Sequence, residues 1–88
     1  MTKPCTIDFE EWSASLHQQS AVPLFHRIAL AFQRAIQSGE VAPGTRLPGE
    51  AQLADKLRIS RPTIRRSLTV LERDGCLERV HGVGTYIR

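Results

Sequence analysis

The sequence predicts a mainly α-helical fold that ends in a small β-hairpin. Apolar residues recur at helical spacing in several segments between Phe9 and Asp74. Beyond Gly75 the pattern changes to two short strand-like runs, 77–80 and 85–87, with a glycine-rich connection between them. The chain has 88 residues, which is the length of one small domain.

Residues 1–22 form an N-terminal extension in which we expect one short helix. Asp8 and Glu11 have the spacing of a capping box, and the helix should end near Gln19. Its apolar stripe consists of Phe9, Trp12 and Leu16. A stripe this short leaves three alternatives open: packing on the domain, packing on a partner chain, or no fixed structure.

The domain proper should span residues 23–88 and begin with a longer helix. Pro23 suits the first helical position, and Gly39 suits the position just after the last turn. Residues at helical spacing between them are Leu24, Ile28, Ala31, Phe32, Ala35 and Ile36. Residues 41–45 have the composition of a turn, and a very short strand is expected at 46–47.

Residues 50–74 have the pattern of a helix-turn-helix. Glu50 begins the first helix, where a carboxylate suits the positive end of the helix dipole. A tight connection at Arg58-Ile59 leads to the second helix, which we expect to run to about Asp74 with Ser60 as its N-cap.

The second helix of this pair has two distinct faces. Its apolar face carries Ile64, Leu68 and Leu71, and a different face carries Arg61, Arg65 and Thr69. Three helices followed by a hairpin, with 46–47 as a third strand of a two- or three-stranded antiparallel wing, make a winged helix-turn-helix. A short helix that exposes arginine in its first turns is what a DNA major groove accepts.

Positive charge is concentrated in the second half of the chain. The net charge is +3, and residues 44–88 hold nine basic and five acidic side chains. The segment 56–66 carries five positive side chains and no acid. Such a run is often only a solvated face, but its position at the start of a helix favours a polyanionic partner.

Several other classes of protein are disfavoured. No apolar run approaches the roughly 20 residues of a membrane helix, and the N-terminus lacks a secretory signal, so we expect a cytoplasmic protein. The two cysteines and three histidines lack metal-ligand spacing, so we expect neither a metal nor another cofactor. We also expect no enzyme, because no paired nucleophile and base and no phosphate loop is visible.

The segment from Pro23 to Ile87 resembles the N-terminal DNA-binding domain of the GntR family of bacterial transcription regulators. The motifs that carry the resemblance, in order, are Pro43-Gly44-Thr45-Arg46-Leu47-Pro48, Glu50, Leu53-Ala54, Ser60-Arg61, Thr63-Ile64-Arg65, Leu77-Glu78-Arg79 and Gly82 to Ile87. No single motif is decisive, but the ordered set is specific.

The resemblance implies sequence-specific binding of double-stranded DNA for transcription regulation, with the recognition helix in the major groove and the wing at the adjacent minor groove. It also implies a palindromic operator bound by a homodimer of the full-length protein, in the bacterial cytoplasm at the nucleoid, with repression as the expected mode. A C-terminal domain, absent from this chain, would bind a small-molecule effector.

Candidate DNA contacts come from the resemblance and from position. The resemblance implies Arg61, Thr63 and Arg65 on the recognition helix, its cap Ser60, Glu50 as a contact or as an orienter of arginine, and Gly82 at the wing tip. Position adds Arg66 as a phosphate contact, Arg58 as a charge that together with Arg66 partly compensates for lost contacts, Thr45 and Arg46 before the helix-turn-helix, and His81 and Val83 on the wing.

This chain departs from the family pattern at several of these positions. Ala51 stands where the family commonly has a DNA-contacting arginine, Pro62 replaces a frequent threonine, and Val83 replaces a common wing arginine. Arg58 stands where glycine is common. The alternative function is a winged-helix module for protein–protein contact, which exposed apolar residues on the second helix of the pair would favour.

Overall fold

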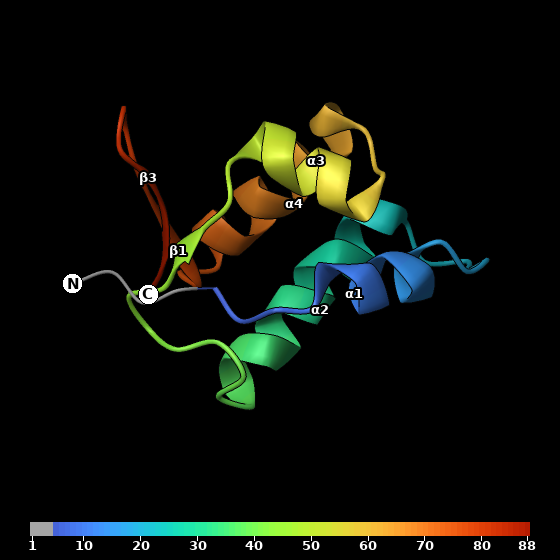
Figure 1. The fold of residues 1–88 in the computed structure, drawn as a ribbon, viewed down its shortest axis with the longest axis horizontal. Coiled ribbons are helices and arrows are strands. Elements are labelled where there is room, and N and C mark those ends of the chain that lie inside the picture. The colour runs from blue at the N-terminus through green and yellow to red at the C-terminus, as the bar shows by residue number, and fades with distance from the viewer. Residues whose placement is uncertain (1–4) are drawn as a thin grey trace.

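The computed structural model describes residues 5–88 as four helices and a small sheet (Figure 1). The helices are α1 (Phe9–Leu16), α2 (Leu24–Gln37), α3 (Glu50–Leu57) and α4 (Arg61–Arg73), and the strands are β1 (Arg46–Leu47), β2 (Leu77–Val80) and β3 (Gly84–Ile87). The winged helix-turn-helix expected from the sequence is therefore confirmed, including its extra N-terminal helix. None of the helices in residues 5–88 combines the length and the apolar character needed to cross a membrane.

The apolar faces of the helices meet in one core. Phe32 and Ile28 of α2 are fully buried, as are Leu53 of α3 and Leu71 of α4. Ile64 is 1% exposed and joins the same cluster. These are the residues that recur at helical spacing in the sequence, so burial of one stripe per helix fixes which face of α4 remains outside.

The sheet is antiparallel with strand order β1-β3-β2. β3 is the central strand: Tyr86 pairs with Arg46 on one side and with Glu78 on the other. The β2–β3 hairpin projects away from the helices (Figure 1). Gly82 turns the hairpin with φ +73°, a conformation that a side chain would strain.

The last turn of α4 ends at a glycine, as the sequence predicts. Gly75 has φ +79°, and the Cys76 N–H donates to the Leu71 carbonyl at 2.9 Å. This bond closes a Schellman motif and satisfies a carbonyl that the helix leaves unpaired. The chain then passes directly from α4 into β2, which places the base of the wing next to the end of α4.

Ser60 occupies the N-cap position of α4 but does not cap it in the expected way. Its hydroxyl makes no hydrogen bond to the helix backbone and instead pairs with the Thr63 hydroxyl at 2.8 Å. Pro62 is the second helical residue and has no N–H to offer, which removes one of the two usual donors for an N-cap side chain.

Two other helix ends differ slightly from the prediction. Pro23 precedes the first residue of α2 with an extended ψ of 142°, so it is the N-cap and not the first helical residue. α1 ends at Leu16, before the expected Gln19. His17 leaves the helix there with ψ near 0°, and its ring is engaged elsewhere in the fold.

α1 packs on the domain, which decides between the alternatives that the sequence left open. Asp8 caps it by accepting from the N–H groups of Glu10 and Glu11 at 3.1 and 3.2 Å. Trp12 makes an edge-to-face contact with Phe32, with ring centroids 4.8 Å apart. α1 thus covers α2 with an aromatic side chain.

Candidate nucleic-acid interface

The exposed side of the helix-turn-helix carries a group of arginines that we call the basic face: Arg58, Arg61, Arg65 and Arg66. All four side chains are exposed, whereas the other side of α4 is buried in the core. No acidic residue lies between positions 56 and 66. The end of α3 and the first turns of α4 therefore present concentrated positive charge at the surface.

Arg65 is held in place by Glu50. Its Nε donates to Oε1 of Glu50 at 3.1 Å, and its Nη2 lies 3.0 Å from the same oxygen. The Arg65 side chain is 58% exposed, so this pair contributes little to stability. Its effect is geometric, because it restricts the guanidinium to one orientation while donors on its far side remain free.

Arg66 lies against α2. The guanidinium carbon is 3.8 Å from the centroid of the Phe25 ring, which is a cation–π contact. The stacked guanidinium keeps its edge N–H groups available at the surface. Arg66 is thus fixed beside the basic face, at a different angle around α4 from Arg65.

Arg58 is the last residue before the turn of the helix-turn-helix and has a left-handed backbone, with φ 57° and ψ 46°. The Ile59 N–H donates to the Ala54 carbonyl at 3.0 Å, which closes the end of α3. Glycine adopts this conformation without strain, which explains why glycine is common at this position in the pattern that the sequence resembles. The structure places the Arg58 side chain on the surface next to the start of α4.

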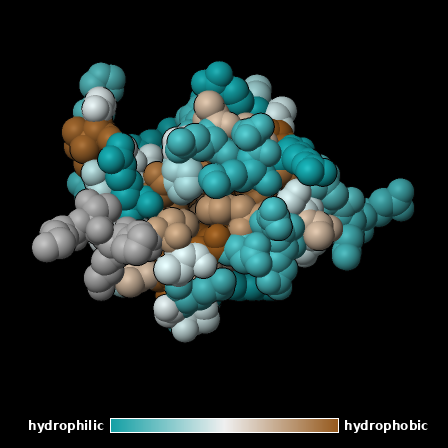
Figure 2. Space-filling view, viewed as in Figure 1, coloured by the Kyte–Doolittle hydropathy of each residue, from teal (hydrophilic) through white to brown (hydrophobic). Residues whose placement is uncertain are grey.

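The wing supplies a second part of the surface. His81, Gly82 and Val83 are exposed at its tip, with Val83 52% exposed and Val80 38% exposed. Figure 2 shows apolar surface on the projecting hairpin. Arg46 reaches this tip from β1, where its Nη2 donates to the Val83 carbonyl at 2.7 Å.

Thr45 differs from the other candidates because it lies inside the fold. Its side chain is 1% exposed, and its hydroxyl donates to the Ala42 carbonyl at 2.6 Å. The neighbouring Arg46 is exposed because the side chains of successive strand residues point to opposite faces. Thr45 therefore closes the turn before β1, and its side chain does not reach the surface.

Arg79 is a structural link that the sequence reasoning did not single out. Its Nη2 donates to the Arg65 carbonyl and to the Thr69 hydroxyl, both at 3.4 Å, and its Nε lies 3.8 Å from a carboxylate oxygen of Glu72. These contacts tie β2 to the middle of α4. Alternation from buried Leu77 places Arg79 on the helix side of the wing, and that signal was available in the sequence.

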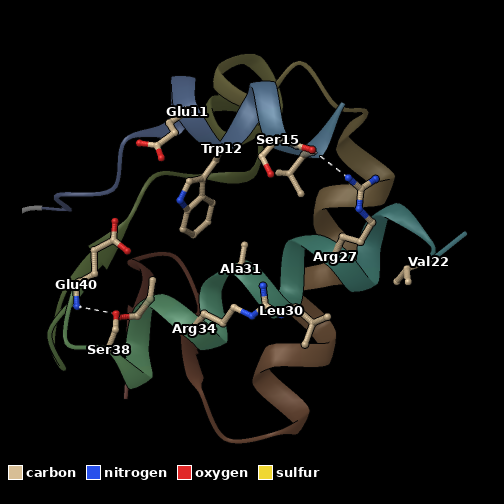
Figure 3. Close-up of a pocket in the computed structure, with 12 residues that line it drawn as sticks. Glu11, Trp12, Ser15, Val22, Arg27, Leu30, Ala31, Arg34, Ser38 and Glu40 are labelled. Carbon is tan, nitrogen blue, oxygen red and sulfur yellow. Dashed lines mark hydrogen bonds between the residues drawn. The ribbon is translucent and has the colours of Figure 1, made fainter. Parts of the chain in front are cut away.

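A separate groove of about 510 Å³ lies between α1 and α2 (Figure 3). Trp12 points into it from α1, toward Ala31 on α2. Arg27 closes one end by donating to the Ser15 carbonyl at 3.1 Å. None of the residues that line this groove belongs to the basic face, so the two surfaces are independent features.

Sequence comparisons place this chain among known regulators. The family described as "Bacterial regulatory proteins, gntR family" matches residues 24–87. "HTH-type transcriptional repressor NagR" of Bacillus subtilis is 34% identical over 73 residues, which are 83% of this chain and 30% of NagR. "Histidine utilization repressor" of Pseudomonas aeruginosa is 43% identical over 65 residues, 74% of this chain and 26% of that protein.

Solved structures agree with this assignment. The structure of AraR(DBD) in complex with operator ORX1 aligns with a TM-score of 0.73 and 26% identity, over 81% of this chain and 92% of that one. YtrA from Sulfolobus acidocaldarius, described as a GntR-family transcription factor, aligns with a TM-score of 0.75 and 26% identity, over 80% and 73% of the two chains. The chain spans less than a third of the length of either curated relative above.

Proposed function

Because this chain belongs to the gntR family of bacterial regulatory proteins, we propose that it binds double-stranded DNA sequence-specifically and so regulates transcription. The observation that carries the proposal is the basic face, where Glu50 holds Arg65 at the exposed start of α4. α4 enters the major groove, and the hairpin lies at the adjacent minor groove. The AraR domain of similar fold was solved with operator DNA.

We assign two kinds of contact to the basic face. Arg61 and Arg65 lie one turn apart on α4 and read base edges, for which an arginine can bind guanine through two parallel hydrogen bonds. Arg58 and Arg66 bind phosphates on either side, because contacts to the backbone orient a protein on the duplex without reading sequence. Thr63 is half-buried beside them and has its hydroxyl close to that of Ser60.

The remaining roles concern the wing and the whole protein. Gly82 lets the hairpin backbone approach the sugar-phosphate chain, with His81 beside it. The complete protein acts as a homodimer on a palindromic operator. It represses transcription, a role that the names of two relatives give for those proteins. A small-molecule effector binds a C-terminal domain outside this chain. A protein with this role works in the cytoplasm, at the nucleoid.

The test is selection of binding sites from random duplexes, followed by titration of a fluorescent duplex of the selected sequence. Arg65→Ala should weaken binding to that duplex by about tenfold or more and relax one base position, since one good bidentate contact contributes roughly 1–3 kcal/mol. Arg65→Lys keeps the charge and should lose the base preference while retaining affinity for unrelated duplexes.

Arg34→Ala is the matched control, because Arg34 is an exposed arginine on α2 outside the basic face. It should bind the selected duplex as the wild type does. If selection enriches no sequence, and Arg65→Ala binds every duplex as well as the wild type, DNA recognition by this face is wrong. The alternative, a winged helix that contacts another protein, would then be favoured.

A further inference from the structure

The tip of the wing has no strong base of its own. The residues that form it are Val80, His81, Gly82, Val83 and Gly84. A minor groove has a negative potential that attracts arginine most strongly where the groove is narrow. A cation at the tip suits this potential, but the five tip residues include no lysine or arginine, and Arg79 further down β2 is turned toward α4.

Arg46 brings a guanidinium to the tip from a different strand. In the register of the sheet, Arg46 lies opposite Tyr86, whereas its Nη2 bonds to the carbonyl of Val83, three residues further toward the turn. The side chain therefore runs diagonally along the hairpin and ends at its tip. One bond to Val83 uses one of the five N–H groups of the guanidinium, and Arg46 is exposed.

Glycine at position 84 leaves room for the Arg46 side chain to follow this path along the hairpin. A Cβ at position 84 would lie 2.8 Å from Nε of Arg46, which is closer than real Cβ atoms approach another atom, and 3.4 Å from its Cζ. φ of Gly84 is not in the left-handed region, unlike that of Gly82. Glycine at position 84 is therefore explained by the space that the arginine occupies, and not by the backbone conformation.

We propose that Arg46 is the arginine of the wing and reads the minor groove next to the major-groove site of α4. This proposal rests on the DNA binding proposed above. The Val83 carbonyl and the bare backbone of Gly84 fix its direction. Because the guanidinium is held in place before DNA arrives, less side-chain entropy is lost on binding. The side chains of Val80 and Val83 are exposed on the same hairpin and can pack on the sugars of the groove wall.

Two substitutions test this assignment together. Arg46→Ala removes the guanidinium, and Gly84→Ala forces it to move while leaving its charge in the protein. Both variants should fold, because Arg46 is exposed and the atom that collides with the new methyl group is the end of a flexible side chain. Thermal unfolding followed by circular dichroism checks the fold, and Arg46→Gln provides a second neutral variant with a longer side chain.

We expect Arg46→Ala to weaken binding to the selected duplex by about tenfold, the value of one good contact to base edges. Gly84→Ala should lose part of this affinity in the wild-type background and nothing further when Arg46 is already alanine. That loss of additivity is the signature of a shared role. Equal losses in both backgrounds would overturn the positioning by Gly84.

Sequence selection gives the second readout. Wild-type protein should select A·T pairs in the flank next to the α4 site, because such flanks narrow the minor groove. Arg46→Ala should select the same central bases without that flank. Replacing flanking adenine by 2,6-diaminopurine adds an amino group in the minor groove only, and it should weaken binding of the wild type but not of Arg46→Ala.

The two proposals fail in different ways. If wild-type protein selects no sequence, the proposed function fails and takes this assignment with it. If wild-type protein selects a sequence, and Arg46→Ala keeps both its affinity and its flank preference, then only the assignment of Arg46 is overturned. Arg34→Ala again serves as the control for loss of one surface charge.

Discussion

At the scale of single residues, Arg58 has two roles that make opposite demands. It is the one residue other than glycine with a left-handed backbone in the part of the chain that the structure describes. It also belongs to the basic face, where its charge suits a phosphate. A glycine would relax the backbone and remove the charge, so stability and binding should respond in opposite directions.

Arg58→Gly should raise the free energy of unfolding by about 0.5–1 kcal/mol. The left-handed conformation costs a residue with a Cβ roughly 1–2 kcal/mol, and the larger chain entropy of glycine cancels about 0.5–1 kcal/mol of that gain. Urea unfolding followed by circular dichroism measures the difference. Arg58→Ala is the control, because it loses the same charge but keeps the backbone strain, and a gain in stability as large as that of Arg58→Gly would contradict this explanation.

The residues also show where sequence reasoning reaches its limit. Ser60 was predicted from its N-cap position, but Pro62 removes a donor and the hydroxyl turns to Thr63 instead. Thr45 was a candidate contact, together with Arg46, because of its place in the turn before the helix-turn-helix. Leu47 and Thr45 are both buried and Arg46 between them is exposed, but a strand of two residues is too short for this alternation to be predicted from the sequence.

At the scale of elements, α1 is more than a cover for the core. Ser13 Oγ donates to the Leu57 carbonyl at 3.1 Å, and His17 Nε2 donates to the same oxygen at 2.9 Å. Leu57 is the last residue of α3, immediately before Arg58 and the turn into α4. α1 thus satisfies a helix-end carbonyl and holds the turn that orients the recognition helix.

Replacing Ser13 and His17 together by alanine should lower the free energy of unfolding by about 1–3 kcal/mol, because each hydrogen bond contributes roughly 0.5–1.5 kcal/mol net. Amide hydrogen exchange should become faster at residues 58–60 before it does in the core of α4. Ser15→Ala, at an exposed position of the same helix, is the control. Unchanged exchange at residues 58–60 would contradict the role of α1 at this turn.

The order and type of the elements could be predicted, whereas several of their contacts could not. Proline and glycine mark the ends of α2 and the turn before β1, and the apolar periodicity of α4 defines its buried face. The docking of α1 depends on two side chains that reach a carbonyl about 40 residues away in sequence, and no local pattern encodes such a bond. The path of the Arg46 side chain to the wing tip likewise depends on the register between β1 and β3, which the sequence does not reveal.

At the scale of the whole molecule, the size of the domain can be compared with the spacing of half-sites in the palindromic operator proposed above. Its longest dimension is 38 Å, and adjacent half-sites on one face of DNA lie about 34–36 Å apart. One copy has a single recognition helix, so it should bind weakly. Binding energy should add up when two copies are held close together, because the second contact then becomes intramolecular.

Two copies joined by a flexible linker should bind a palindrome of the selected half-site about 100-fold or more tightly than one copy does, provided the linker spans the two sites. Moving the half-sites apart by about five base pairs places them on opposite faces of the helix and should remove most of this gain. Titration of both duplexes with the linked protein measures the effect. Equal affinity for both spacings would argue against a symmetric site.

The Arg46 guanidinium leaves no room for a methyl group at position 84, and this also constrains how relatives of this domain can diverge. A bulkier residue there is compatible with the fold only when position 46 has a short side chain or one that turns away, so changes at the two positions should arise in pairs. Lineages that lose the arginine at 46 are free to fill position 84, and such lineages should also have acquired a base elsewhere on the hairpin, with Val83 as the nearest place for it.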